Sequence, residues 1–125
     1  MSKSTHERPP LWVGHISLET SCLDETDSFM RTIGMRSVVK TDEIAILELR
    51  GGTHIVLISK PTIDASEASF DLMVEDLDET HRHYHDLGLP ISDISRGKIH
   101  DWFTVTEPAG NTIKFNSTHV GDLPV

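Results

Sequence analysis

The side chains best suited to chemistry in this sequence are its eight histidines. Four of them lie in or beside segments with the composition of strands: His15, His54, His100 and His119. Several imidazoles that converge can bind zinc, nickel or iron, and a single imidazole can accept a proton near neutral pH. The alternative is that these histidines are separate hydrogen-bonding groups along a polar surface. Their spacing alone leaves both interpretations open.

The run "HRHYH" is a weaker candidate for metal binding. On a helix His81 and His85 share one face while His83 points elsewhere, so the three imidazoles do not converge. We interpret the run as a solvated helix face with Tyr84 buried. Cys22 is the only cysteine, which excludes an internal disulfide, and we interpret it as a small buried thiol rather than a nucleophile.

The segments that must position these residues include a repeated sequence. The phrase "LDETDSFMRTIGM" (Leu23–Met35) returns as "LDETHRHYHDLGL" (Leu77–Leu89), with four identical residues at the start and a glycine eleven places later. Apolar residues recur at helical spacing in both copies, and each glycine suits a left-handed helix end. We expect Asp24 and Asp78 to cap the two helices. The chain therefore contains a duplicated module.

Strand-like segments surround each predicted helix. One alternating segment precedes each copy, and three follow it: "SVVK", "EIAILEL" and "THIVLIS" in the first half, then a weaker one around "ISDI" followed by "DWFTVT" and "TIKFNS" in the second. The predicted fold is α+β, with two tandem βαβββ modules forming curved mixed sheets around a cleft. The expected division is a flexible leader, first module, linker, second module and C-terminal tail over residues 1–10, 11–60, 61–68, 69–117 and 118–125 of one structural domain.

The composition limits the classes of partner that the protein can bind. A net charge of −9 with 37% hydrophobic residues is typical of a globular protein. The acidic balance argues against nucleic acid and against anionic membranes, because both need basic patches. No apolar run approaches the ~20 residues that span a bilayer. The opening "MSKSTHERPP" lacks the apolar core of a signal peptide, so we expect a cytoplasmic protein.

Four motifs in order carry a resemblance: "GHISLET", "LDET…IGM", "FDLMVEDLDE…LGL" and "TEPAGNTIKF". The chain resembles the vicinal oxygen chelate superfamily, which includes glyoxalase I, extradiol dioxygenases, fosfomycin-resistance enzymes and bleomycin-resistance proteins. The resemblance implies a ligand cleft between two curved sheets, with up to four metal ligands on the first and fourth strands of both modules. It also implies a homodimer with a small-molecule partner.

The sequence departs from the metal-binding pattern of that superfamily. His15 stands at the first ligand position, but the second, third and fourth positions fall on Val56, Ser69 and Lys114. An ammonium group repels a divalent cation, so we expect the usual site to be lost and no cofactor to be bound. If zinc, nickel, iron or manganese is bound, the ligands expected are His15, His54 and His100.

Strand alternation assigns the remaining side chains to faces. It predicts Ile55, Leu57, Ile113 and Phe115 in the core. It predicts a ligand-binding cleft lined by His15, His54, Asp71, Trp102, Lys114 and Asn116.

The expected function is therefore binding of a small ligand in this cleft by a glyoxalase-, bleomycin-resistance- or dioxygenase-like protein. The alternative is a metal-dependent lyase or dioxygenase of the same superfamily. In a catalytic version without metal, His15 or His54 would be the base and Lys114 would stabilise an oxyanion. We expect Asp71 or Glu19 to pair with that lysine.

Overall fold

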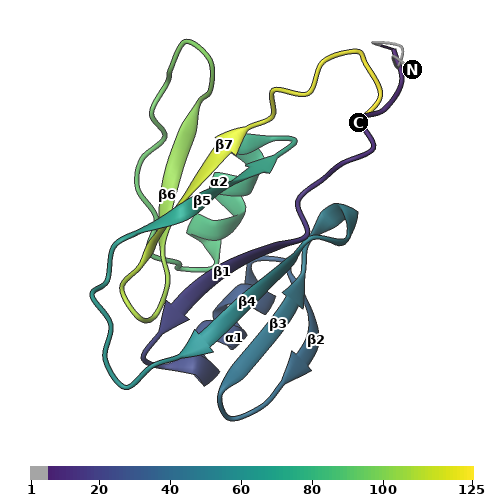
Figure 1. Ribbon diagram of the computed structural model, residues 1–125. Coiled ribbons are helices and arrows are strands. Elements are labelled where there is room, and N and C mark those ends of the chain that lie inside the picture. The colour runs from purple at the N-terminus through teal and green to yellow at the C-terminus, as the bar shows by residue number, and fades with distance from the viewer. Residues whose placement is uncertain (1–5) are drawn as a thin grey trace.

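The repeated phrase forms both α-helices in the part of the chain that the structure describes. The computed structural model describes residues 6–125, so residues 1–5 of the expected leader lie outside the described residues. Helices α1 (Leu23–Thr32) and α2 (Leu77–Asp86) each begin at the leucine of the repeat (Figure 1). Gly34 and Gly88 follow them with φ of 125° and 74°. The predicted helices and their glycine ends are confirmed.

The N-terminal caps lie two residues earlier than expected. Cys22 and Asp76 occupy the N-cap positions, and Asp76 Oδ1 accepts a hydrogen bond from the Glu79 N–H at 3.0 Å. Asp24 and Asp78 lie inside the first turns, so the prediction that they cap the helices was wrong. Their negative charges still favour the helices, because the N-terminal end of the helix dipole is positive.

Within residues 6–125, seven strands form two mixed sheets with the same plan. In the first sheet the order is β1 (His15–Thr20), β4 (His54–Ser59), β3 (Ile44–Glu48) and β2 (Arg36–Lys40), and a short 3-10 turn at Arg50–Gly52 joins β3 to β4. In the second sheet the order is β5 (Glu67–Val74), β7 (Thr112–Ser117) and β6 (Trp102–Thr106). Each module pairs its first and last strands in parallel. The predicted α+β fold of two related modules is confirmed.

The weak strand around "ISDI" is reduced to two isolated bridges, Ile91 with Val105 and Ser95 with Trp102. The ladder breaks because the Ser92 carbonyl lies 2.8 Å from Nε2 of His81, while the Thr104 N–H donates to the Ser92 hydroxyl instead.

His81 also sets the edge of its ring against Phe103, with 5.0 Å between ring centroids. It is a half-buried packing residue. The interpretation of the whole histidine run as a solvated face was therefore wrong for His81, whereas Tyr84 is buried as predicted.

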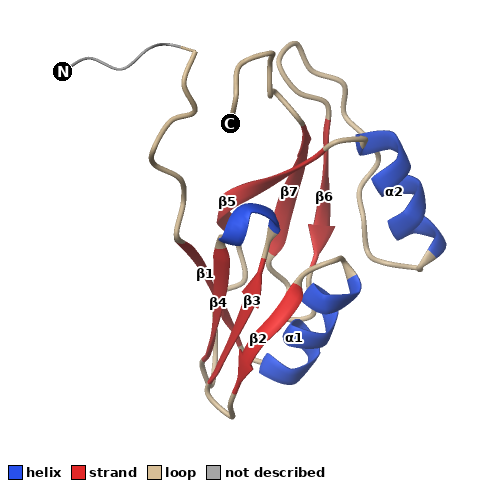
Figure 2. Ribbon diagram, turned by 90° about the vertical axis from the view of Figure 1, so that its right-hand side faces the viewer, coloured by secondary structure: helices blue, strands red, loops and turns tan. Residues whose placement is uncertain are grey.

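Both helices cover the same side of the strands, which leaves the opposite faces of the two sheets open (Figure 2). The predicted alternation is confirmed on β4 and β7, where Ile55, Leu57, Ile113 and Phe115 are buried. These residues belong to one hydrophobic cluster that spans both modules. None of the helices in the described part of the chain is long and apolar enough to cross a membrane.

A turn of the second module holds the two modules together. Glu107 is almost completely buried, and its Oε2 accepts a hydrogen bond from the Thr26 hydroxyl of α1 at 2.8 Å. Four residues later, Asn111 Nδ2 donates to the Glu19 carbonyl at 2.9 Å. These contacts fix the end of β1 and the start of α1 against the turn that precedes β7 in the second sheet.

Candidate functional site

One group of polar residues lies on the open face of the first sheet. The strand registers place His15 and Glu48 on either side of His54. The His15 and His54 rings are 5.8 Å apart between centroids, and Nε2 of His54 lies 3.2 Å from Oε2 of Glu48. Arg36 forms an ion pair with the other oxygen of Glu48. We call these four residues the histidine group.

The carboxylate sets the chemistry of this group. When Nε2 of His54 donates its proton to Glu48, Nδ1 is left with a lone pair that can accept a proton from a ligand. An imidazole oriented in this way by a carboxylate is the arrangement of a general base. The Arg36 guanidinium pairs with the opposite oxygen of Glu48, which leaves Oε2 to face His54.

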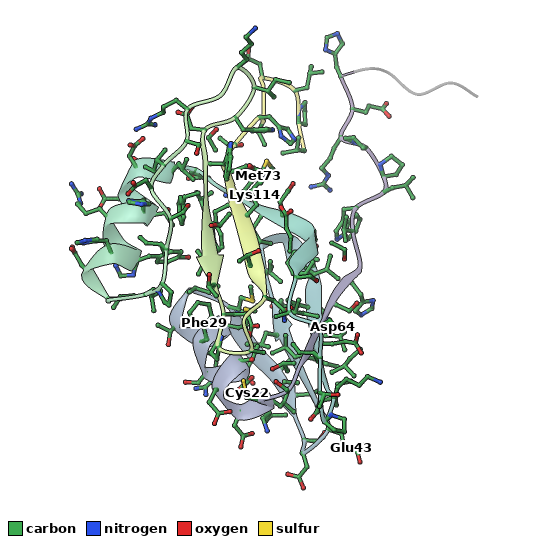
Figure 3. The ribbon with its side chains drawn as sticks, turned by 90° about the vertical axis from the view of Figure 1, so that its left-hand side faces the viewer. Cys22, Phe29, Glu43, Asp64, Met73 and Lys114 are labelled. Atoms are coloured by element: carbon green, nitrogen blue, oxygen red, sulfur yellow. The ribbon has the colours of Figure 1, made fainter. Side chains whose placement is uncertain are left out.

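A second group lies on the open face of the second sheet. The Lys114 ammonium nitrogen sits 4.5 Å from the centre of the Trp102 ring and 4.0 Å from Oε1 of Glu67. A cation over an aromatic face is attracted by the electron-rich ring. We call Lys114, Trp102 and Glu67 the lysine group. Figure 3 shows Lys114 beside Met73, at the opposite end of the molecule from Glu43.

The partner of Lys114 differs from the two that we expected. Asp71 is its register neighbour on β5, yet the ion pair is made by Glu67. The pairing of β5 with β7 shifts register between Glu67 and Asp71, and this irregularity brings Glu67 within reach. Glu19 pairs instead with Lys60 at 3.8 Å. The expectation that Asp71 or Glu19 holds the lysine was wrong.

The last predicted cleft residue, Asn116, is buried although it lies on the open face of β7. Its register neighbours are Trp102 and Met73, whose large side chains flank it. Asn116 can therefore support the tryptophan, and it offers little surface to a ligand.

A groove of ≈ 510 Å³ adjoins the lysine group through Glu67. Its lining comes from the end of β1, the start of β5 and the segment that connects the modules, and includes Ser17, Glu19, Asp64, Ser66, Glu67 and Asn111. In Figure 3 Asp64 lies between Lys114 and Glu43. None of the six residues predicted for the cleft lines this groove. Glu67 belongs to both the groove and the lysine group.

The residues at the four expected ligand positions do not fit a divalent metal. His15 offers an imidazole, but Val56 has no donor atom and the Lys114 ammonium is already held by Glu67 and Trp102. The alternative set is not assembled either, because His100 contacts His119 rather than His15 or His54. Across residues 6–125, no three histidine, cysteine, aspartate or glutamate side chains are grouped as metal ligands.

Sequence reasoning missed Glu48, Arg36 and Glu67. A signal for Glu48 was present, because Glu48 and His54 are equally distant from Gly51 in the "LRGGT" turn, and a tight hairpin pairs such residues. The position of Glu67 depends on the irregular β5–β7 register, and no local sequence pattern predicts this irregularity.

Comparison with solved structures finds the same fold in other proteins. Lactoylglutathione lyase from Agrobacterium tumefaciens has a TM-score of 0.75 and 18% identity, over 88% of this chain and 96% of that chain. A glyoxalase/bleomycin resistance protein/dioxygenase from Alicyclobacillus acidocaldarius has a TM-score of 0.71 and 21% identity, over 91% and 96%. The chain has the vicinal oxygen chelate fold.

The same fold is found in a bleomycin-binding protein complexed with bleomycin, with a TM-score of 0.70 and 18% identity over 86% of this chain and 98% of that chain. The resemblance predicted from the four motifs is thus confirmed at the level of the fold. Neither protein-family models nor curated protein sequences match the sequence.

Proposed function

We propose that this vicinal oxygen chelate protein binds a small anionic or carbonyl-bearing molecule on the open faces beside the groove, without a metal at the position typical of the fold. The observation that carries the proposal is Lys114. Its ammonium stands at the strand position where the superfamily pattern has a carboxylate ligand, and Trp102 and Glu67 hold it there. A fixed positive charge can then do part of the electrostatic work of a metal ion.

The lysine group is suited to ligand exchange. The ion pair between Lys114 and Glu67 is long, at 4.0 Å, and the lysine side chain is 35% exposed. Such a pair contributes little stability because water screens it. An incoming carboxylate or carbonyl oxygen can therefore replace Glu67 while the Trp102 ring continues to hold the ammonium.

Proteins with the same fold support the binding of a small molecule. One of them is complexed with bleomycin and another is a lactoylglutathione lyase. Their names cover a binder and an enzyme, so the fold alone favours neither.

The test uses Lys114→Met, which removes the charge at similar size, and Lys114→Glu, which reverses it. Binding of bleomycin, of lactoylglutathione and of a panel of small carboxylates and carbonyl compounds is measured by calorimetry. We expect both variants to lose binding of the ligand that the wild type selects. Lys60→Met is the matched control, because Lys60 also pairs with a groove carboxylate, Glu19. Unchanged binding in Lys114→Met, or stoichiometric metal held through His15, contradicts the proposal.

The histidine group favours a second candidate, an enzyme that removes a proton from its substrate. His54 would be the base and Glu48 its orienting carboxylate, 3.2 Å away. The two functions are separated by analysing the bound molecule after incubation. A ligand recovered unaltered indicates a binder, whereas a product formed by the wild type and not by His54→Gln indicates an enzyme.

We further propose that the protein is a homodimer of the cytoplasm. Val38 and Val39 on the edge strand β2 are 49% and 41% exposed, and Trp12 before β1 is 74% exposed. A second copy would cover these apolar side chains. The free thiol of Cys22 suits a reducing compartment.

A further inference from the structure

We propose that His100 and His119 form a binding site for a divalent transition-metal ion, with Zn²⁺ as the best fit. The site lies past the end of β7, where the C-terminal tail meets the segment that leads into β6. It is separate from the histidine group, the lysine group and the groove. Neither residue has a part in the function proposed above.

The distance between the two rings favours zinc. Nδ1 of His119 lies 3.3 Å from Nε2 of His100. Two nitrogen ligands at Zn–N distances of about 2.0–2.1 Å in a tetrahedral site are separated by roughly 3.3–3.4 Å. The two nitrogens therefore already have the spacing of one edge of a zinc tetrahedron. The rings are tilted by 58° and not stacked face to face.

His100 has the hydrogen bonding of a metal ligand. Its Nδ1 lies 2.9 Å from the Ser117 carbonyl oxygen, which can only accept, so Nδ1 carries the proton. The lone pair of Nε2 then points toward His119. Histidines that bind metals almost always donate their other N–H to a carbonyl or carboxylate in this way, because the bond fixes the tautomer and the ring orientation.

Ion pairs and hydrogen bonds hold the backbone around His100 in place. Arg96 bridges Asp78 of α2 at 2.6 Å and Asp101 at 2.9 Å. Asp101 in turn accepts from the Gly97 N–H and donates its own N–H to the Ser117 hydroxyl. A Cβ at Gly97 would come within 2.4 Å of the His100 carbonyl oxygen, so this tight turn requires glycine. One half of the site is thus preorganised.

His119 supplies the adaptable half. It is exposed on the tail, so its ring can turn. On binding, the proton of His119 Nδ1 moves to Nε2 through solvent and Nδ1 coordinates the ion, with no change in net protonation. Water completes the tetrahedron, because two protein ligands leave two positions open. The net charge of −9 raises the local concentration of cations.

The experiment titrates untagged protein with ZnCl₂ by calorimetry. We expect one Zn²⁺ per chain, and a loss of affinity of more than about tenfold in both His100→Ala and His119→Ala. The double variant His83→Ala, His85→Ala is the matched control, because it removes two exposed histidines of α2 and should bind as the wild type does.

Hydrogen exchange gives a second readout that does not depend on affinity. Zinc should slow exchange of the amides of residues 118–120 in the wild type, because the ion ties the tail to His100, and should not do so in His119→Ala. Unchanged affinity in both alanine variants overturns the proposal, as does the absence of zinc binding by the wild type. Binding that is lost in His15→Gln but kept in His119→Ala also overturns it, because the ion would then lie on the first sheet.

Discussion

Among single residues, Glu107 links the two modules through a buried hydrogen bond to Thr26. It is 1% exposed, and its carboxylate accepts three hydrogen bonds: from the Thr26 hydroxyl and from the N–H groups of Ala109 and Asn111. No side-chain cation pairs with it among the described residues. A buried carboxylate is tolerated in such a place because directed hydrogen bonds replace its hydration.

We predict that Glu107→Ala lowers the free energy of unfolding by about 2–4 kcal/mol, because two backbone N–H groups and a hydroxyl lose their acceptor inside the protein. Thr26→Val should cost less, about 1–2 kcal/mol: Glu107 keeps its two backbone donors, while the Thr20 hydroxyl, 2.7 Å from that of Thr26, also loses a partner. Urea unfolding of the two single variants and the double variant measures the coupling between them. Additive effects would show that the Thr26–Glu107 bond does not join the modules.

Tyr84 gives a prediction about pH. It is buried, and its hydroxyl donates to the Ile33 carbonyl at 2.7 Å. Burial raises the pKa of Tyr84 from 10.0 to about 12. The folded state thus holds this proton more tightly than the unfolded state, so the stabilisation is complete below about pH 10 and is lost as the pH rises through about 12.

Tyr84→Phe should therefore cost about 1 kcal/mol near pH 8, from the lost hydrogen bond. The difference between wild type and variant should shrink by about pH 11, because only the tyrosine is exposed to deprotonation. Urea unfolding at both pH values checks this. A difference that stays constant or widens with pH would mean that Tyr84 ionises at least as readily in the folded state as in the unfolded state.

At the scale of elements, the sequence predicted what repeats and alternation can express. The duplicated phrase located both helices, and period-two alternation located the buried faces of β4 and β7. It did not locate the break beside β6, because that break depends on a contact between His81 and the Ser92 carbonyl, eleven residues apart. Sequence periodicity predicts which face of a helix or strand a residue occupies. It does not predict which side chains of other elements that residue contacts.

The same limit applies to the candidate site. The faces of His15, His54 and Lys114 followed from alternation, and the neighbours that define their chemistry did not. Glu67 reaches Lys114 through an irregular strand register. Glu48 was accessible in principle, because the hairpin through Gly51 fixes its pairing with His54.

Gly34 and Gly88 test the equivalence of the two modules. Both have positive φ and open space where a Cβ would be, so alanine there is strained by the backbone conformation alone. We predict that Gly34→Ala and Gly88→Ala each cost about 1–2 kcal/mol. Gly14→Ala is the matched control, because Gly14 also has open space but no positive φ, and should be nearly neutral. Thermal unfolding measures all three, and a neutral result at either helix end would argue against the left-handed geometry there.

For the whole molecule, the two open faces differ in chemistry. The second sheet presents the charged lysine group, whereas the first presents an apolar row beside its histidine group. In that row Val39 pairs with Ile46, and Ile46 pairs with Val56. The three side chains are only partly covered in the single chain, and Val39 is 41% exposed. A sheet face of this kind is stable in water when another surface packs on it.

The last prediction follows from the proposed homodimer, in which the second copy covers this row. Val56→Asp places a carboxylate at the centre of the row, where association would bury it without a partner. We expect the dimer to weaken by about 3 kcal/mol or more, which is over a hundredfold in the dissociation constant. Sedimentation equilibrium over a range of protein concentrations measures this. Leu123→Asp is the control, since Leu123 is an exposed apolar residue of the tail outside the row, and it should leave association unchanged. A wild-type chain that stays monomeric at every concentration would contradict the homodimer. A Val56→Asp variant that dimerises like the wild type would place the interface elsewhere.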